Sequence, residues 1–291
     1  MMHKRLPITK KIILFFKFII RNRYIPNIKR PMTFNEKIFS RIIYTNNSLF
    51  SECSDKLAVK DYIKKKGLDS IIIENVFISN YLTKENVFNA LDDAPEGVML
   101  KANHNSGPVF HIDSTTPKFQ IIHAINSINK QLKLNYGLRY GESWYSNIHP
   151  KAFIEKLIKT KDGEELRDYK FHVFKQKNND FKIILHVDFN RSTNHTRTYF
   201  DENLNYIPIS SYAPSLIKNI EKPRNYSKML KIAKELAEPF DYVRVDLYNI
   251  EGDIYFGELT FAQGAGLSKF GSKKEDLFLG SHWNMESNKW N

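Results

Sequence analysis

Two segments near the end of the chain carry acidic residues at a spacing that suits metal binding. Residues 242–261 read YVRVDLYNIEGDIYFGELTF, and apolar residues recur at every second position before and after the turn-forming Glu251-Gly252-Asp253. Because this period is that of a strand with two unlike faces, the segment is predicted to form a β-hairpin. Asp246 lies on its first strand and Glu258 on its second.

The register of this hairpin follows from its turn. If Glu251-Gly252-Asp253 is a three-residue loop, Asp246 lies opposite Glu258 and Arg244 opposite Thr260. The other face is then apolar, with Val243, Val245 and Leu247 against Phe261, Leu259 and Tyr255. Two carboxylates about 5 Å apart are destabilising unless a cation or a proton lies between them. The pattern predicts a magnesium site, which binds through one or two carboxylates and substrate phosphates. The alternative is a surface hairpin whose acidic residues face water.

The composition of the chain indicates a cytoplasmic protein with anionic partners. Its 291 residues include 44 Lys or Arg and 32 Asp or Glu, which gives a net charge of +12. This excess favours nucleotides, acidic polysaccharide, lipid headgroups or nucleic acid as partners. The single cysteine, Cys53, excludes a disulfide framework and suits a reducing cytoplasm. The length allows two lobes that share one active site.

Residues 1–50 are predicted to be a basic, amphipathic helical segment. Residues 12–20 are apolar except for one lysine, and basic residues lie on both sides of them. This run is far shorter than the roughly 20 residues that span a bilayer, and it lacks the cleavage site of a secretory signal. Two interpretations stay open: the helix packs on the domain with its lysines in solvent, or it lies on the inner face of the cell membrane.

The remaining patterns predict an α+β fold. Helices are expected at residues 33–44, 54–66, 117–133 and 226–238, the first with a capping box formed by Thr33 and Glu36. Strands are expected at residues 98–101, 152–154, 169–174 and 181–189, the last two paired around Asn178-Asn179. The absence of a regular βαβ period argues against a Rossmann domain. Neither a GxGxxG motif nor a Walker lysine motif is present.

Three segments have residue types that suit a nucleotide. Lys101 ends a strand directly before the small, polar loop 102–107, as would a lysine that reaches a phosphate. Glu155 lies beside apolar residues, as an adenine pocket requires, and Asp168 begins a strand where it could accept hydrogen bonds from ribose. Each also has an ordinary interpretation, as a strand-end lysine, a strand edge and a solvated strand end.

The loop 191–197 is predicted to bind an anion or a substrate carboxylate. It carries Arg191, His195 and Arg197 directly after an apolar strand. A nucleic-acid patch is the rival interpretation, but aromatic residues are not interleaved with the basic ones. Zinc is not expected, because the cysteine and the histidines lack ligand spacing. A cysteine nucleophile is not expected either, since Cys53 has no basic partner nearby.

The order of these features resembles the ATP-grasp superfamily, and most closely its TupA-like branch, named for teichuronopeptide biosynthesis. The resemblance covers roughly residues 30 to 285. Its landmarks are PMTFNEK at 31–37, Asp55-Lys56, VKDY at 59–62, LKANHNSG at 100–107, YGE at 140–142, Pro150 with Ile154-Glu155, DYKF at 168–171, VRVDLY at 243–248 and YFGELTF at 255–261. The last two segments are the most specific.

This resemblance implies a fold of two α+β lobes with largely antiparallel sheets that hold ATP between them. We expect the N-terminal lobe at residues 51–140 and the C-terminal lobe, with the metal-binding hairpin, at residues 141–291. Lys56 and Lys101 match the two lysines that contact the phosphates in related ligases. A closing flap is expected over the phosphates, with contacts from Asn103, Ser106 and Gly107.

The same resemblance implies roles for residues of the second lobe. Glu155, Lys156 and Leu157 match the adenine-contacting segment, and Asp168 matches the ribose acceptor. The metal ligands are matched by Asp246, Glu258 and Thr260. Thr260 departs from the family pattern, because its hydroxyl stands where an asparagine is frequent and is a poorer ligand. Arg244 matches an arginine near the reacting phosphate.

The implied activity is that of an ATP-dependent carboxylate–amine ligase with Mg²⁺. A substrate carboxylate attacks the γ-phosphate of ATP to give an acyl phosphate, and an amine then displaces phosphate to leave an amide. Arg191, His195 and Arg197 are candidates for binding the γ-phosphate or the acceptor. The family name suggests substrates in cell-surface polysaccharide, with an amino acid or amine joined to a uronic acid.

Three rival functions are considered. A glycosyltransferase typically has a D-x-D motif at a strand end, and none is present. A non-catalytic nucleotide-binding or membrane-associated assembly protein would bind Mg-ATP without releasing ADP. A nucleic-acid partner is suggested by charge alone and is not expected; such binding would depend steeply on salt.

Overall fold

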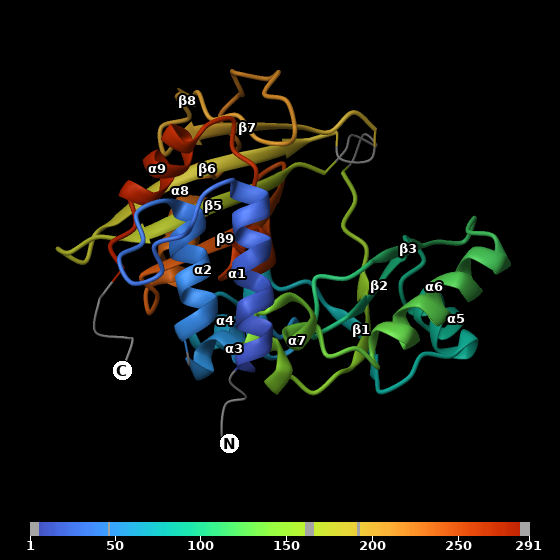
Figure 1. The fold of residues 1–291 in the computed structure, drawn as a ribbon. Coiled ribbons are helices and arrows are strands. Elements are labelled where there is room, and N and C mark those ends of the chain that lie inside the picture. The colour runs from blue at the N-terminus through green and yellow to red at the C-terminus, as the bar shows by residue number, and fades with distance from the viewer. Residues whose placement is uncertain (1–5, 46, 161–165, 191–192, 286–291) are drawn as a thin grey trace.

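Two antiparallel sheets organise the part of the chain that the computed structural model describes, residues 6–45, 47–160, 166–190 and 193–285 (Figure 1). Its helices are α1 (Ile8–Asn22), α2 (Phe34–Tyr44), α3 (Ser48–Ser54), α4 (Ala58–Lys65), η1 (Asp69–Ile71), α5 (Lys84–Asp93), α6 (Lys118–Gln131), α7 (Tyr136–Tyr140), η2 (Ser143–Asn147), α8 (Tyr226–Ala237), η3 (Gln263–Gly266) and α9 (Lys273–Ser281). Its strands are β1 (Asn75–Ser79), β2 (Val98–Ala102), β3 (Phe110–Ile112), β4 (Ala152–Lys156), β5 (Asp168–Lys175), β6 (Phe181–Phe189), β7 (Thr196–Asp201), β8 (Tyr206–Ile207), β9 (Tyr242–Ile250) and β10 (Asp253–Thr260). The α+β prediction is confirmed.

The larger sheet has the strand order β10-β9-β5-β6-β7-β8, and every neighbouring pair is antiparallel. One of its faces is apolar, because alternate residues of β5 and β9 such as Phe171 and Val245 are fully buried. Helix α8 packs against these two strands, and the ring of Tyr226 lies 6.3 Å from that of Phe171. This burial fixes which side chains must point to the opposite face.

The opposite face of the larger sheet is aromatic at one end of its strands and charged at the other. At one end the ring of Phe34, from α2, packs edge-on against Tyr242 at a centroid distance of 5.3 Å. At the other end Lys170 of β5 lies opposite Asp246 of β9. This end is where the chain enters β5 after leaving the smaller lobe. The charged end of the face is therefore brought to the junction of the two lobes.

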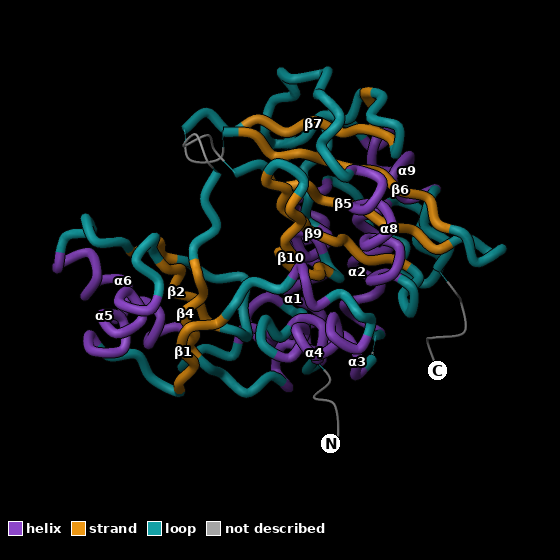
Figure 2. Tube along the Cα trace, turned by 180° about the vertical axis from the view of Figure 1, so that it is seen from behind, coloured by secondary structure: helices purple, strands orange, loops and turns teal. Residues whose placement is uncertain are grey.

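The smaller sheet has the order β1-β4-β2-β3, again antiparallel throughout. Helices α5 and α6 cover one of its faces, on the side away from the larger lobe (Figure 2). Val98, Leu100 and Ala102 of β2 are buried beneath them. Because side chains alternate along a strand, Lys101 and its cross-strand partner Phe153 point to the other face, toward the larger lobe.

The described residues form two hydrophobic cores, one in each lobe. Residues 82–128 together with Ala152 and Ile154 form the core of the smaller lobe, whereas residues 6–71 and Trp144 share the larger core with residues 169–283. The predicted division into 1–50, 51–140 and 141–291 remains a prediction. Helices α1 to α4 cross the position of the first boundary and pack on the larger lobe because their apolar faces, including Phe18, Phe34 and Ile63, are buried there.

Most predicted elements form at the expected positions. Helix α2 begins at a capping box in which the Thr33 hydroxyl accepts a hydrogen bond from the Glu36 amide at 3.0 Å. The helix expected at residues 54–66 forms as α4 but begins later than predicted, at Ala58, because Ser54 ends α3 instead. The carboxylate of Asp55 accepts a hydrogen bond from the Leu57 amide at 2.9 Å, which turns the chain between the helices.

The hairpin of β9 and β10 has the predicted register at its carboxylates, but its turn is shorter than predicted and its second strand contains a bulge. Ile250 pairs with Asp253, so the turn has two residues, Glu251 and Gly252, both with positive φ, rather than three. A β-bulge at Gly257 then shifts the register by one residue and sets Asp246 opposite Glu258 and Arg244 opposite Thr260, as predicted.

Because of the bulge, the apolar face of the hairpin includes Phe256 rather than the predicted Tyr255. Leu247 lies opposite Phe256, whereas Tyr255 lies opposite Tyr248 on the other face. Ile254 and Phe256 are buried at 5% and 6% exposure, so they line the apolar side beside Leu259. The alternation along β10 reverses at Gly257, which a strict period of two could not anticipate.

Candidate functional site

Five charged side chains meet on the charged end of the larger sheet. Arg244 donates two hydrogen bonds to Asp246, from Nε to Oδ1 at 2.6 Å and from Nη2 to Oδ2 at 2.7 Å. The same Nη2 donates to Glu258 Oε1 at 2.7 Å. Lys170 Nζ donates to Asp246 Oδ2 at 2.7 Å and to Asp168 Oδ2 at 2.5 Å. We call these five residues the acidic cluster, because three carboxylates exceed two cations by one negative charge.

The strand registers explain why these residues come together. Lys170 pairs with Asp246 across β5 and β9, and Asp246 pairs with Glu258 across β9 and β10. Arg244 and Asp168 each lie two residues from a member of these pairs, so they share the same face. The side chains of Asp168 and Asp246 are 3% and 2% exposed, whereas that of Glu258 is 36% exposed. Glu258 is therefore the carboxylate of the acidic cluster that is most open to a ligand.

The predicted need for a cation between Asp246 and Glu258 is met here by Arg244. The carboxylate pair alone does not demand a metal ion, and the metal role remains a prediction. Within the described residues, no group of three or more His, Cys, Asp or Glu side chains is arranged to hold a metal ion. The donor set nevertheless fits Mg²⁺ shared with a phosphate, since two carboxylates and substrate oxygens satisfy that ion. Thr260 donates its hydroxyl hydrogen to Glu258 Oε1 at 2.9 Å and so orients this carboxylate.

A second charged group lies on the face of the smaller sheet that points toward the larger lobe. Glu155 accepts two hydrogen bonds from lysine side chains. Lys101 Nζ donates to Oε2 at 2.5 Å, and Lys60 Nζ donates to Oε1 at 2.8 Å. Lys60 also donates to the carbonyl oxygen of Ile73 at 2.6 Å. We call Lys60, Lys101 and Glu155 the basic cluster, because two ammonium groups share one carboxylate. It carries one net positive charge, opposite to that of the acidic cluster.

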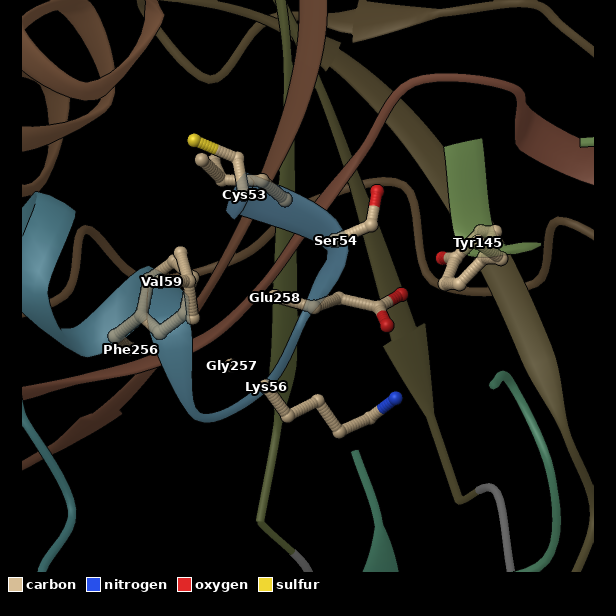
Figure 3. A pocket seen from close by; sticks show the side chains of 9 residues that line it. Cys53, Ser54, Lys56, Val59, Tyr145, Phe256, Gly257 and Glu258 are labelled. Carbon is tan, nitrogen blue, oxygen red and sulfur yellow. The ribbon is translucent and has the colours of Figure 1, made fainter. Parts of the chain in front are cut away.

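Lys56 lies between the two clusters, on the turn that joins α3 and α4. Its ammonium group donates to the carbonyl oxygen of Asn105. Burial lowers the pKa of Lys56; the charges of Glu258 and Glu155 oppose that shift, and the charge of Lys101 adds to it. These couplings place Lys56 within electrostatic reach of both clusters. Figure 3 shows the charged ends of Lys56 and Glu258 on the same side of a small pocket.

The loop expected to close over the phosphates is held at its beginning. Asn103 donates from Nδ2 to Asp55 Oδ1 at 2.9 Å and accepts at Oδ1 from the Lys151 amide at 2.7 Å. Its side chain and those of His104 and Asn105 are buried, while Ser106 is exposed. Motion of this loop would therefore be limited to the part around Ser106 and Gly107. The phosphate-closing role remains a prediction.

The residues predicted to contact adenine and ribose already have partners in the protein. Lys156 Nζ donates to Glu74 Oε2 at 2.5 Å, and the amide of Leu157 donates to the Gly97 carbonyl at 3.0 Å. The carboxylates of Glu155 and Asp168 are engaged in the basic and acidic clusters. Asp168 is thus buried rather than a solvated strand end. None of these roles is tested by the geometry, and each remains a prediction.

Two basic residues of the predicted anion-binding loop contact Asp188. Arg191 lies outside the described residues. His195 Nε2 and Arg197 Nε lie 2.9 and 2.7 Å from Asp188 Oδ1, and Arg197 Nη2 lies 3.0 Å from Asp188 Oδ2. Burial raises the pKa of Asp188, but the contacts with Arg197 and His195 outweigh it and lower the pKa to about 2. Asp188 was not singled out in the sequence; its position opposite Arg197 in the β6–β7 register accounts for the pairing.

A cavity of about 330 Å³ lies beside Arg244. Four basic residues line it, and no acidic residue does; the four are Arg21, Arg197, Arg244 and Lys269. Gln263 also lines this cavity, is 6% exposed, and its Oε1 has no hydrogen-bond partner among the described residues. The cavity can therefore receive an anionic group together with a hydrogen-bond donor. The contributions of Arg21 and Lys269 were missed because they come from distant segments.

Glu142 is a further acidic residue of the site. Burial raises its pKa to about 8, and the charge of Glu258 adds to the shift while that of Arg244 opposes it. It therefore holds a proton at neutral pH. The YGE segment at 140–142 was noted as a landmark, but no role was predicted for its glutamate. Its neighbour Tyr145 lines the small pocket with Lys56 (Figure 3).

A family model described as "TupA-like ATPgrasp" matches residues 36–284. The chain belongs to the TupA-like ATP-grasp family. This match covers nearly all of α2, then α3, α4, both sheets and α9, but not α1, and it confirms the resemblance and the ATP-grasp fold that the sequence motifs indicated. Comparison with curated proteins gave no match.

Solved structures similar to this TupA-like chain include two ligases and one synthetase. D-alanine–D-alanine ligase from Helicobacter pylori is 17% identical, with a TM-score of 0.46 over 80% of this chain and 61% of that one. N5-carboxyaminoimidazole ribonucleotide synthetase from Thermus thermophilus is 12% identical, with a TM-score of 0.40 over 75% and 48%. The ATP-grasp ligase PsnB, complexed with minimal precursor, Mg and ADP, is 12% identical, with a TM-score of 0.39 over 75% and 53%. The chain thus spans about half to three-fifths of their lengths.

Proposed function

We propose that this chain is an ATP- and Mg²⁺-dependent carboxylate–amine ligase that releases ADP. The observation that carries the proposal is that Lys56 lies within electrostatic reach of both charged clusters, one with net negative and one with net positive charge. A triphosphate is strongly anionic, so its oxygens suit Lys56 and Lys101. The acidic cluster, which has excess negative charge and an exposed Glu258, suits the metal ion that accompanies ATP.

Mg²⁺, when bound, would neutralise charge on the transferred phosphoryl group. Asp246 and Glu258 would hold it, and Thr260 would orient Glu258. Arg244 would contribute its guanidinium beside the reacting phosphate, where it stabilises charge that develops on the equatorial oxygens. Lys170 would hold Asp246 in place, because its ammonium group lies between Asp246 and Asp168.

The cavity beside Arg244 supports an anionic substrate. Its volume is at the lower end of the range of about 300–1,000 Å³ that small-molecule sites occupy, which suits a sugar acid or an amino acid. A carboxylate oriented by Arg197 and Arg244 would attack the γ-phosphorus, break its bond to ADP and form an acyl phosphate. The nitrogen of an amine would then attack the acyl carbon, release inorganic phosphate and lose a proton to leave an amide.

We further propose that the carboxylate belongs to a uronic acid of a cell-surface polysaccharide or its precursor, and that the amine is an amino acid or a small amine. The basic cavity and the net charge of +12 support an acidic glycan substrate. The chain's single cysteine, Cys53, forms no disulfide framework, which agrees with a cytoplasmic location.

The test is an ADP-release screen of the purified chain with Mg-ATP and pairs of uronic acids and amines. We expect ADP release to require both an acid and an amine. Glu258→Gln should lose at least a hundredfold in turnover, whereas Glu85→Gln, an exposed glutamate on α5, should retain wild-type turnover. Binding of Mg-ATP without ADP release for any pair would favour a non-catalytic assembly protein. Release of a nucleoside diphosphate from a nucleotide sugar would favour a glycosyltransferase.

A further inference from the structure

Helix α1 exposes a largely apolar surface, interrupted by Thr9, that the ligase site does not use. Its outer face consists of five residues that are each between 50% and 78% exposed: Ile8, Ile12, Ile13, Phe16 and Ile20. At about 100° per residue, these side chains span an arc of about 140° of the helix. Figure 1 shows α1 at the front of the molecule, with no other element of the described chain covering that side. We call this surface the α1 outer face.

The opposite side of α1 is fixed to the larger lobe. Leu14 and Phe18 are buried, and the ring of Phe18 lies 5.1 Å from that of Phe39. Lys10 Nζ donates to the Arg139 carbonyl at 2.8 Å, and Arg21 Nε donates to the Leu267 carbonyl at 3.2 Å. The helix is held near both ends, so the α1 outer face cannot be buried by a simple rotation of the helix.

The charges around this face decide what can cover it. The first 35 residues contain no Asp or Glu, and they contain nine Lys or Arg. Lys17, Arg23, Lys29 and Arg30 are all exposed on or directly after α1. A second copy of the chain bound through the same face would bring these cations against one another across the interface, which is unfavourable. An anionic surface would instead attract every one of them.

We propose that the α1 outer face docks the protein on an anionic lipid bilayer. The helix would lie in the plane of the interface, with its five apolar side chains among the acyl-chain ends and its basic residues at the headgroup level. Within the described residues, no helix is long and apolar enough to cross a membrane. The docking is therefore peripheral. The docking depends only on α1 and the basic residues that follow it, up to Arg30, so its test does not depend on the ligase reaction.

Vesicle co-sedimentation of the full chain tests this proposal. We expect binding to vesicles of equal parts phosphatidylglycerol and phosphatidylcholine, and at least tenfold weaker binding to phosphatidylcholine alone. The double variant Phe16→Ser with Ile20→Ser should bind at least tenfold more weakly, because it removes two apolar anchors. The matched control is Phe119→Ser, which alters a 69% exposed phenylalanine on α6, in the other lobe; its binding should equal that of the wild type.

A second pair of variants tests the charge component. Lys17→Gln with Lys29→Gln should weaken binding by about fivefold per charge, whereas Lys84→Gln with Lys118→Gln, which are exposed lysines of the smaller lobe, should not. Circular dichroism should show unchanged thermal unfolding for all variants, since every altered side chain is exposed. Equal binding to neutral and anionic vesicles, or binding that survives Phe16→Ser with Ile20→Ser, would overturn the proposal. A dimer in sedimentation velocity that Phe16→Ser dissociates would also overturn it in favour of self-association.

Discussion

Lys170 neutralises two buried carboxylates, and its replacement by methionine provides a direct test of the acidic cluster. The side chains of Lys170, Asp168 and Asp246 are 8%, 3% and 2% exposed. Methionine keeps much of the volume of lysine but has no ammonium group. The variant would leave the acidic cluster with three carboxylates and one guanidinium, so its net charge would change from one to two negative charges.

The expected cost follows from the burial of these partners. Removing one member of a buried ion pair typically destabilises a protein by about 3–5 kcal/mol, because the remaining charge stays buried without compensation. Arg244 still contacts Asp246, which limits the loss there, and Asp168 loses its 2.5 Å contact with the Lys170 ammonium but keeps another interaction in the protein. We therefore expect Lys170→Met to lower the free energy of unfolding by about 3 kcal/mol, the lower end of that range.

Urea unfolding followed by circular dichroism measures this quantity. Lys170→Met should lower the midpoint with little change in the slope. Lys182→Met, on β6 of the same sheet and partly exposed, is the matched control and should change the free energy of unfolding by less than about 0.5 kcal/mol. If Mg²⁺ binds at the acidic cluster, millimolar Mg²⁺ should restore part of the stability of Lys170→Met. A loss below about 1 kcal/mol for Lys170→Met would show that the contacts described for Lys170 do not form.

Three further outcomes follow from other buried groups. Because burial raises the pKa of Glu142 to about 8, the folded state retains a proton that the unfolded state releases above its ordinary pKa. This contribution to the free energy of unfolding is present at low pH and is lost as the pH rises toward 8. Glu142→Gln should abolish this pH dependence and should be more stable than the wild type in urea at high pH. An unchanged pH dependence in the variant would refute the raised pKa of Glu142. Arg41→Met should destabilise by about 3–5 kcal/mol in the same assay, since Asp241 would lose its buried partner, and wild-type stability would contradict that contact. Gly280→Ala should lower the Tm, because its Cβ would overlap the backbone carbonyl oxygen of Met32; an unchanged Tm would mean that this close packing is absent.

The hairpin illustrates what the sequence could and could not predict. Alternation indicated the two strands, and the requirement for an apolar face indicated the pairing of Asp246 with Glu258. The turn length was wrong by one residue and the bulge at Gly257 was not foreseen, but the two shifts cancel at the carboxylates. A bulge depends on tertiary packing of the strand, so a local pattern cannot locate it.

The charged clusters were harder to predict than the strands. Asp168 was assigned from its position in a motif, but its contact with Lys170 follows from the β5–β9 register, which joins segments far apart in the chain. Similarly, Lys60 and Glu155 meet only because α4 packs near the smaller sheet. Arg21 reaches the basic cavity because α1 folds back on the larger lobe. Sequence alone gives the types of these residues, and the fold decides their partners.

The measurement that tests the central claim most directly is calorimetric titration with a non-hydrolysable ATP analogue, with Mg²⁺ and with EDTA. The account predicts that Mg²⁺ tightens binding to the wild-type chain at least tenfold, that Glu258→Gln loses this gain, and that Glu85→Gln keeps it. Equal affinity with and without Mg²⁺ in the wild type, or an undiminished gain in Glu258→Gln, would contradict it.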